Sequence, residues 1–403
     1  FAEMRRGTHD GNVHMASNYG MAMLYTRHLP KAGHDEDLAL AWANGAIALA
    51  DRHPDPKKRV FVGAFMRNAR ALVELHRGDL KGSLALVEEA IAMTDADLDP
   101  DEQLLHRSVL LYNRAQILFA LGDMEGGLAD YDEVIRRDPD YGDYYFERAA
   151  KRRAAGRLTE ALQDYSEAIR LSPPFREAHF NRADLLRELG DEKGALRDLD
   201  YALELEPDHV DSLVNRVDVL LALGETEQAR TDIRRGLELS PHNAQLLCAE
   251  GTLLADEGDL DAAFASYTAA IQEDPGFVAL WANRAVLSYS AGRIQDAVAD
   301  LNHAIRLSDD PALRANRALA LQDLGDHEQA LKDLDIAVPA LAAHDPDLLY
   351  RRGASRYELG DTEGALADWR AHLAAFTPGQ SSEHITEIRQ RAGDSLNVPE
   401  GAA

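Results

Sequence analysis

The chain has 403 residues, and its 70 acidic residues exceed its 43 basic residues, which gives a formal net charge of −27. Hydrophobic residues make up 45% and charged residues 28% of the chain, a balance that is typical of a folded protein and excludes a wholly disordered one. No apolar stretch approaches the ~20 residues that a membrane-spanning helix needs, and the acidic balance repels phosphate backbones and anionic lipid headgroups, so we expect neither nucleic-acid nor membrane binding.

The first 63 residues predict N-terminal helices that contain a degenerate repeat. The repeat covers about residues 20–53, where Ala39 and Ala46 align with the small residues of later repeats. Because the chain begins with Phe1 and not with Met, we expect a processed chain or a piece of a longer protein.

Residues 64–97 predict a divergent repeat, in which Gly78 and Ala90 keep the register of the later repeats. The charged segment Asp51–Arg59 contains two prolines and predicts a link between this repeat and the helices before it. Residues 98–107 then break the period, and we expect them to form an insertion loop.

From residue 108 to residue 378 the sequence repeats with a period of 34 residues that shifts by one in the last units. Glycine and proline mark the period at Gly122, Gly156, Gly190, Gly224 and Gly258 and at Pro139, Pro173, Pro207, Pro241 and Pro275. Each unit predicts two amphipathic helices, since glycine suits the left-handed residue that ends a helix and proline stops helix propagation. Residues 379–403 predict a polar capping helix over Ser382–Ala392 and a tail.

This pattern resembles the tetratricopeptide repeat family, whose 34-residue units carry small residues at positions 8 and 20, glycine at 15 and proline at 32. In that numbering, eight units begin at Ser108, Gly142, Arg176, Val210, Ala244, Val278, Pro311 and Pro346. The resemblance implies an all-α fold, a right-handed superhelical solenoid of stacked helix–turn–helix hairpins. It also implies that the first helix of each unit lines a concave groove, toward which positions 2, 5, 6, 9, 12 and 13 point.

Positions 7 and 23 of the units carry charges of opposite sign. Position 7 is arginine in seven of the eight units, at Arg114, Arg148, Arg182, Arg216, Arg284, Arg317 and Arg352. Position 23 is aspartate in the same seven units, at Asp130, Asp164, Asp198, Asp232, Asp300, Asp333 and Asp368. The one unit that lacks the arginine, with Glu250, also lacks the aspartate and has Ser266. We therefore predict an Arg–Asp pair that joins the two helices of each hairpin, because either partner alone would be costly to bury.

The candidate binding residues lie at the positions that face the groove. Position 5 is aromatic in four units, at Tyr112, Phe146, Phe180 and Tyr350. Position 6 is asparagine in five units, at Asn113, Asn181, Asn215, Asn283 and Asn316. Position 12 is arginine in two units, at Arg153 and Arg187. The aromatic residues predict an apolar stripe, although packing between units explains them equally well. An asparagine amide can pair with both backbone groups of a peptide, and such a row resembles the asparagine ladder of peptide-binding superhelices; local capping is the alternative. The two arginines predict positive points in an acidic groove.

No motif in the chain indicates catalysis, a metal or a cofactor. The aspartates between Asp95 and Asp101 alternate as in a calcium loop, but Pro100 replaces the required glycine and His106 the closing glutamate. No histidine is spaced so that it could act as a base for the Cys248 thiol, so we expect Cys248 to be a small apolar packing residue and not a nucleophile. The histidines are scattered, and we expect no metal site. A single cysteine suits a reducing compartment, and we expect a cytoplasmic protein.

The sequence therefore predicts a non-catalytic scaffold that binds a protein or peptide segment in the concave groove. A net charge of −27 favours a neutral or basic partner, and self-association through the terminal repeats is a further expectation. Two alternatives remain open. The chain could be the partner-sensing region of a larger regulatory protein, or an accessory subunit that delivers substrate within an enzyme complex.

Overall fold

A computed structural model of the protein describes residues 11–28, 35–99, 102–375 and 382–393. These residues form α-helices joined by short turns, with no strand among them. They divide into two compact units, unit 1 over residues 1–206 and unit 2 over residues 207–403, which are described separately. In the part of the chain that the structure describes, no helix has both the length and the apolar character needed to cross a membrane. The predicted fold class, an all-α solenoid of stacked helical hairpins, is confirmed.

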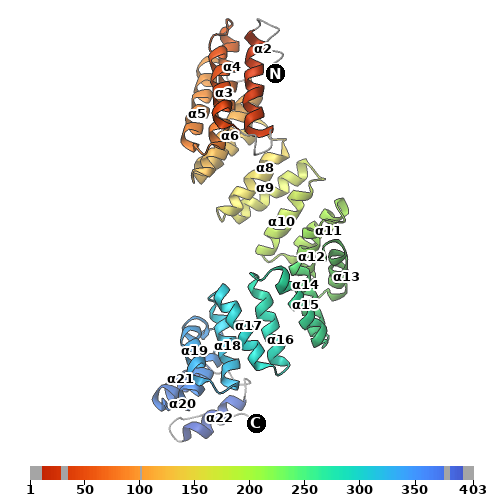
Figure 1. The fold of residues 1–403 in the computed structure, drawn as a ribbon, viewed down its shortest axis with the longest axis vertical. Coiled ribbons are helices and arrows are strands. Elements are labelled where there is room, and N and C mark those ends of the chain that lie inside the picture. The colour runs from red at the N-terminus through yellow and green to blue at the C-terminus, as the bar shows by residue number, and fades with distance from the viewer. Residues whose placement is uncertain (1–10, 29–34, 100–101, 376–381, 394–403) are drawn as a thin grey trace. The chain divides into compact units, whose positions relative to one another are not determined.

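Unit 1 is a series of helical hairpins in chain order (Figure 1). Its helices are α2 Gly11–Met23, α3 Glu36–Ala50, α4 Pro56–His76, α5 Leu80–Asp97, α6 Leu104–Ala120, α7 Met124–Arg137, α8 Gly142–Ala154, α9 Leu158–Leu171, α10 Arg176–Glu188 and α11 Glu192–Leu205, and a short π-helical segment, η1 Leu24–His28, follows α2. The pairs α2/α3, α4/α5, α6/α7, α8/α9 and α10/α11 form the hairpins. Each first helix also packs on the second helix of the preceding hairpin.

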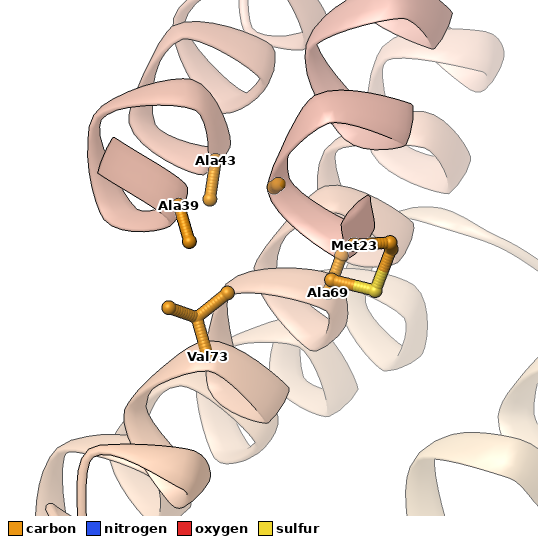
Figure 2. Packing of buried hydrophobic residues seen from close by; sticks show 6 residues of the cluster. Met23, Ala39, Ala43, Ala69 and Val73 are labelled. Atoms are coloured by element: carbon orange, nitrogen blue, oxygen red, sulfur yellow. The ribbon is translucent and has the colours of Figure 1, made fainter. Parts of the chain in front are cut away.

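A core of small side chains holds the N-terminal hairpin on α4. Figure 2 shows Ala39 and Ala43 of α3, Met23 of α2, and Ala69 and Val73 of α4 pointing toward one another, all with less than a tenth of their surface exposed. The helices can approach closely because most of these side chains end at Cβ. The α2/α3 hairpin therefore covers one face of α4.

The helix bounds differ from the sequence prediction at several places. The predicted link Asp51–Arg59 is partly helical, since α4 begins at Pro56 with the Asp55 side chain accepting a hydrogen bond from the Lys58 amide at 3.2 Å; proline is well suited to a first helical position. For the same reason the predicted boundary at residue 64 falls inside α4. The degenerate repeat predicted from residue 20 likewise begins inside α2.

The predicted insertion loop at 98–107 also ends earlier than expected, because α6 begins at Leu104. The buried Arg107 guanidinium explains the difference. It donates hydrogen bonds to the Thr94 carbonyl at 2.6 Å and the Leu98 carbonyl at 3.2 Å, and it pairs with Asp95. These bonds fasten the start of α6 to the end of α5.

Unit 2 continues the hairpin pattern. Its helices are α12 Val210–Leu223, α13 Thr226–Leu239, α14 Ala244–Asp256, α15 Leu260–Glu273, α16 Val278–Ser290, α17 Ile294–Leu307, α18 Pro311–Asp323, α19 His327–Leu341, α20 Asp347–Glu358, α21 Thr362–Ala375 and α22 Ser382–Ala392. Helices α12 to α21 form five hairpins, and α22 packs on the last one.

In the hairpins from α4/α5 to α20/α21, the turn between the two helices contains the left-handed glycine that the spacing predicts. Gly190, for example, has φ 79°, a left-handed value that a residue with a Cβ adopts at a cost. Asp191 follows it and accepts a hydrogen bond from the Gly194 amide at 2.8 Å, which caps α11. The turn and the cap together set where the second helix starts.

The predicted Arg–Asp pair is present in all seven units that carry both residues. Each arginine donates two hydrogen bonds to the two oxygens of its aspartate, at 2.6–2.9 Å. The aspartate side chains are only 2–8% exposed. In the exceptional unit, the Ser266 hydroxyl donates to the Glu250 carboxylate at 2.8 Å instead. Two-point pairs of this kind fix direction as well as distance, so they set the angle between the two helices.

Several of these arginines also reach the preceding hairpin. Arg148 contacts Asp132 at 2.6 Å, Arg182 contacts Ser166 at 3.1 Å, Arg284 contacts Thr268 at 3.1 Å and Arg317 contacts Asn302 at 2.7 Å. All four acceptors stand at position 25 of their units. At the junction before Glu250, position 25 of the preceding unit is Arg234. The basic residue is therefore at position 25 and the acidic residue at position 7, the reverse of the arrangement at Arg148 and Asp132. Glu250 and Arg234 line the same hollow of about 390 Å³ in unit 2.

The Arg–Asp pairs predict how substitutions at Arg114 and Asp130 change the free energy of unfolding. Arg114→Ala is expected to lower the free energy of unfolding by roughly 2–3 kcal/mol, because it leaves the Asp130 carboxylate buried without its partner. Arg114→Glu is expected to cost more, since it sets two carboxylates against each other. Adding Asp130→Ser to Arg114→Glu recreates the Glu250–Ser266 arrangement and is expected to recover most of the loss, as measured by urea denaturation.

Arg136→Ala is the matched control for these variants. Arg136 lies on α7, and its pair with Glu133 leaves the arginine side chain 69% exposed. Its removal is expected to change stability by less than about 0.5 kcal/mol. The pairing account is wrong if the double variant at positions 114 and 130 is no more stable than Arg114→Glu alone.

Candidate functional site

A hollow in unit 1 combines two of the predicted binding residues with several that the sequence did not indicate. It has a volume of about 500 Å³ and is lined by Leu105, Val109, Tyr112, Asn113, Asp138, Tyr141, Asp143, Tyr144 and Glu147. These residues come from α6, from α8 and from the segment before α8. We call this hollow the tyrosine pocket. Its lining contains three tyrosines and three carboxylates, and no basic side chain.

The tyrosines of this pocket form a connected set of rings. The Tyr144 ring lies 4.7 Å from that of Tyr141, centroid to centroid, and 6.2 Å from that of Tyr112. The Tyr112 ring meets the buried Tyr131 ring edge-on at 5.8 Å. Aromatic pairs at such distances stabilise one another and hold their rings in fixed positions.

The Glu147 carboxylate is a shared hydrogen-bond acceptor in the tyrosine pocket. Its carboxylate accepts hydrogen bonds from the Tyr112 hydroxyl at 3.0 Å, from the Tyr131 hydroxyl at 2.5 Å and from the Gln116 amide at 3.2 Å. Burial and the Glu147 carboxylate raise the pKa of Tyr112 to about 12. The same two causes raise the pKa of Tyr131 as well. Both phenols donate hydrogen bonds to the Glu147 carboxylate, and their raised pKa values keep these donors protonated even at mildly alkaline pH.

Acidic side chains also surround the outer rings of the pocket. A hydrogen bond to Asp143 and partial burial raise the pKa of Tyr141. Burial and the charges of Asp138, Asp143 and Glu147 raise the pKa of Tyr144. The pocket thus presents aromatic rings within a negative field.

Apolar side chains are exposed at the edge of the same pocket. Leu105 is 74% exposed, and Leu104, Val109 and Tyr141 are also exposed beside it. The α6 helix carries Leu104 and Leu105 in the extra turn that Arg107 fastens to α5. An exposed cluster of large apolar residues at a hollow is typical of an interaction surface.

The other predicted aromatic residues are partly used in packing. Phe146 is half-buried, and its ring packs 4.8 Å from that of Phe175 and 5.9 Å from that of Tyr165. Phe180 is also half-buried. These contacts are with Tyr165 of α9 and with Phe175 in the turn before α10, as the packing alternative anticipated, and they leave part of the Phe146 ring exposed.

Tyr350 corrects the prediction of an aromatic residue on an open groove. It is only 8% exposed, because α22 lies over it. Its ring stacks on His384 at 3.8 Å, and its hydroxyl donates to Glu387. The terminal helix occupies the face on which a further repeat would otherwise pack.

Arg153, one of the two arginines at position 12, differs from the prediction of a positive point in the groove. Arg153 on α8 is paired with Glu188 at 3.1 Å and with Asp184 at 3.8 Å, both on α10. Its charge is therefore balanced by the neighbouring hairpin. Arg187 is half-buried and has interactions of its own. Arg153 joins adjacent first helices and does not present an unbalanced charge.

The asparagines at position 6 differ in their surroundings. Asn113 donates a hydrogen bond to the Asn68 side-chain oxygen at 2.8 Å, which links α6 to α4. Asn181 and Asn215 are half-buried, and Asn316 is exposed. The Asn283 amide lies 3.6 Å from the Cys248 sulfur. A uniform ladder is thus interrupted by internal bonds at Asn113 and Asn283.

A second hollow, in unit 2, contains Asn283. It has a volume of about 340 Å³ and is lined by Thr252, Ala255, Asp256, Leu260, Tyr267, Asn283, Val286, Leu287 and Ser290. Val286 is exposed at its edge. Cys248 lies nearby on α14, and burial raises the pKa of its thiol. A thiol with a raised pKa is a poor nucleophile, in line with the expected apolar filler.

Sequence reasoning missed Leu105, Tyr141, Tyr144 and Glu147. The aromatic and acidic side chains between 141 and 147 form a dense run in the sequence, which could have indicated the tyrosine pocket. The repeat numbering obscured it, because Tyr141 and Tyr144 stand at positions 34 and 3, which are not expected to face the groove.

Comparisons with known proteins agree with this architecture. Two family models, both described as tetratricopeptide repeat, match the chain, one at residues 112–174, 152–196 and 180–244 and the other at 254–320. A tetratricopeptide repeat protein from Parabacteroides merdae is 21% identical to the chain, with a TM-score of 0.52, over 62% of this chain and 98% of that one. The APC/C hetero-tetramer Cut9-Hcn1 contains a chain that is 14% identical, with a TM-score of 0.51, over 86% of this chain and 90% of that one. Comparison with curated protein sequences gave no match.

The tyrosine pocket predicts a titration that can be observed directly. Tyr112 is expected to ionise near pH 12, about two units above an ordinary tyrosine. A raised tyrosine pKa contributes stability that is fully present below about pH 10 and is lost as the pH rises through 12. Glu147→Gln removes the adjacent charge and is expected to lower the pKa of Tyr112, although burial keeps it above the ordinary value.

Phenolate absorbance measures this pKa, as the difference between wild type and Tyr112→Phe and between the same pair in the Glu147→Gln background. Circular dichroism at each pH checks that the protein stays folded. An unchanged Tyr112 pKa in the Glu147→Gln background would show that the carboxylate is not part of this network.

Proposed function

Because the chain belongs to the tetratricopeptide repeat family, we propose that it is a non-catalytic scaffold that binds a protein or peptide segment along the first helices of its hairpins. Repeats of this family serve protein interaction, and the hairpins here supply the faces that such an interaction needs. In this proposal, the tyrosine pocket of unit 1 binds a basic side chain of the segment together with an apolar side chain next to it.

The tyrosine pocket is the observation that carries this proposal. Its three tyrosines offer π-faces and its three carboxylates offer negative charge within one hollow of about 500 Å³. A lysine or arginine side chain suits both, since a cation is attracted to an aromatic face and to a carboxylate. The exposed Leu105 and Val109 at the edge suit an apolar side chain next to that cation.

The charge of the whole chain supports the same partner. A net charge of −27 attracts a basic segment over a distance of about a Debye length and raises its association rate at low ionic strength. The partner that we propose is therefore a neutral or basic protein segment and not a nucleic acid. The single thiol suits a reducing compartment, and we propose the cytoplasm as the location.

Tyr112 in the tyrosine pocket and Cys248 beside the hollow of unit 2 support a non-catalytic role. Burial raises the pKa of the Cys248 thiol and of the Tyr112 phenol, which moves both further from ionisation at neutral pH. Neutral thiols and phenols are weak nucleophiles. These side chains are suited to contact and hydrogen bonding.

The remaining predicted residues keep supporting roles in this proposal. Phe146 and Phe180 would contact apolar side chains of the segment with the parts of their rings that packing leaves exposed, and Asn181 would bond the segment's backbone. In unit 2, the exposed Asn316 would offer its amide to a backbone in the same way. A neutral hydrogen bond of this kind is worth about 1 kcal/mol, so these residues would add affinity without strong sequence preference.

Short labelled peptides test the pocket. The probe is a fluorescent peptide with one lysine between two leucines, and the comparison peptides replace the lysine by norleucine or glutamate. The lysine peptide is expected to bind at least about tenfold more tightly than the glutamate peptide, from cation–π and charge contributions of roughly 1–2 kcal/mol. Tyr144→Ala is expected to weaken binding of the lysine peptide about tenfold, as truncation of an aromatic contact does. Fluorescence anisotropy measures each affinity.

Tyr145→Ala is the matched control on the same helix. Its hydroxyl donates to the Pro139 carbonyl at 3.1 Å and its ring lies 5.5 Å from the Arg148 guanidinium carbon, so it is outside the tyrosine pocket. Its substitution is expected to leave peptide affinity unchanged. If Tyr145→Ala weakens binding as much as Tyr144→Ala does, or if the norleucine peptide binds as tightly as the lysine peptide, the assignment of this pocket is wrong.

A further inference from the structure

The last hairpin of unit 2 brings together three potential metal ligands. Asp347 is the first residue of α20, His372 lies on α21 and His384 lies on α22. One ligand atom from each of these side chains lies within 4.8 Å of the other two. Among the residues that the structure describes, this is the group of three histidine or acidic side chains whose ligand atoms lie close enough together to bind one metal ion.

Both histidines lie close to the Asp347 carboxylate. His372 is 4% exposed, and its Nδ1 lies 3.0 Å from the Pro346 carbonyl oxygen and 3.8 Å from an Asp347 carboxylate oxygen. In the tautomer that donates Nδ1–H to that carbonyl, Nε2 keeps its lone pair, and this backbone bond is the usual support of a metal-bound histidine. A fixed, buried imidazole of this kind loses little freedom on binding a metal.

His384 has a ring nitrogen whose partner is missing. Its Nδ1 is buried and has no hydrogen-bond partner, although it lies 3.5 Å from an Asp347 carboxylate oxygen. The ring is held in place by stacking on Tyr350 at 3.8 Å with an interplanar angle of 16°. Two ligand atoms bound to one tetrahedral zinc ion lie about 3.3 Å apart, given bonds of ~2.0 Å. The separation of this nitrogen and this oxygen is close to that value.

The repeat pattern supplies an independent observation. His372 stands at position 27 of its unit, where Ala168, Ala202, Ala270, Ala304 and Ala337 stand in five of the others. Those alanines are fully buried. The last hairpin therefore carries an imidazole at a site that elsewhere takes a methyl group, and it does so where α22 brings a second histidine.

We propose that Asp347, His372 and His384 bind one divalent transition metal ion of the Zn²⁺ class, with water in the remaining coordination position. Two imidazoles and one carboxylate form a donor set that suits Zn²⁺ and not Ca²⁺ or Mg²⁺, which prefer oxygen ligands. Asp347 is half-exposed, so the ion and its water can reach the site from solvent. The site is separate from the tyrosine pocket, which lies in the other unit.

The metal would fasten the terminal helix to the repeats. Ile388 and Ala392 of α22 pack on Tyr350 and Trp369 of the last hairpin, and the three ligands come from all three helices. Binding would stabilise this docked arrangement, because a ligand that binds only the folded form shifts the equilibrium toward it. The packing of α22 on the apolar surface of the last hairpin would then depend on the bound metal.

Zinc titration of the full chain, without any affinity tag, tests the site. Competition with a chromogenic zinc chelator is expected to show one Zn²⁺ per chain, and added Zn²⁺ is expected to raise the thermal unfolding temperature. His384→Ala and Asp347→Asn are each expected to weaken zinc binding by more than about 100-fold, since the loss of even an outer-shell partner costs 10–100-fold. Both are also expected to abolish the thermal shift.

His242→Ala is the matched control, because His242 is an exposed histidine that lies 2.7 Å from a carboxylate, Glu273, but belongs to no group of three potential ligands among the described residues. Its zinc affinity is expected to equal that of wild type. His372→Gln is a further test only if circular dichroism shows it folded, because His372 is buried; His384→Ala and Asp347→Asn decide the matter without it. Absence of stoichiometric zinc binding by the wild type, or equal affinity in wild type and His384→Ala, would overturn the proposal.

Discussion

The two-point pair between arginine at position 7 and aspartate at position 23 is the interaction on which the rest of the structure depends. It joins the two helices of a hairpin at a nearly constant distance of 2.6–2.9 Å in seven units. Because the aspartate is almost fully buried, separation of the helices would leave a charge without a partner in an apolar interior, which costs several kcal/mol. The pair therefore fixes the hairpin geometry, and the exposed side chains of the first helix are free to vary.

Departures from the repeat are where the chain gains distinctive chemistry. The extra turn at the start of α6, fastened by Arg107, exposes Leu105 beside the tyrosine pocket. The histidine at position 27 of the last unit meets a second histidine from α22. At Glu250 the charges of the junction are exchanged and a hollow forms. A regular repeat supplies a stable frame, and the irregular residues make individual surfaces on it.

The frame could be predicted from the sequence because its signals recur at a fixed spacing. Glycine every 34 residues predicted the left-handed turns, and the joint loss of arginine and aspartate at Glu250 and Ser266 revealed their pairing. The start of α4, the burial of Tyr350 and the pairing of Arg153 with Glu188 were not predicted. They depend on local capping or on contacts between side chains whose separation in the chain follows no rule. The tyrosine pocket was missed in part for the same reason, because Glu147 binds residues from two other helices.

Hydrogen–deuterium exchange of the full chain, with and without a peptide that carries one lysine between two leucines, tests the central claim most directly. The account predicts slower exchange on binding in α6 and in the first half of α8, which line the tyrosine pocket. The other helices of unit 1 are expected to change little. Protection confined to the second helices α7 and α9, with α6 and α8 unaffected, would contradict the assignment of partner binding to the first helices.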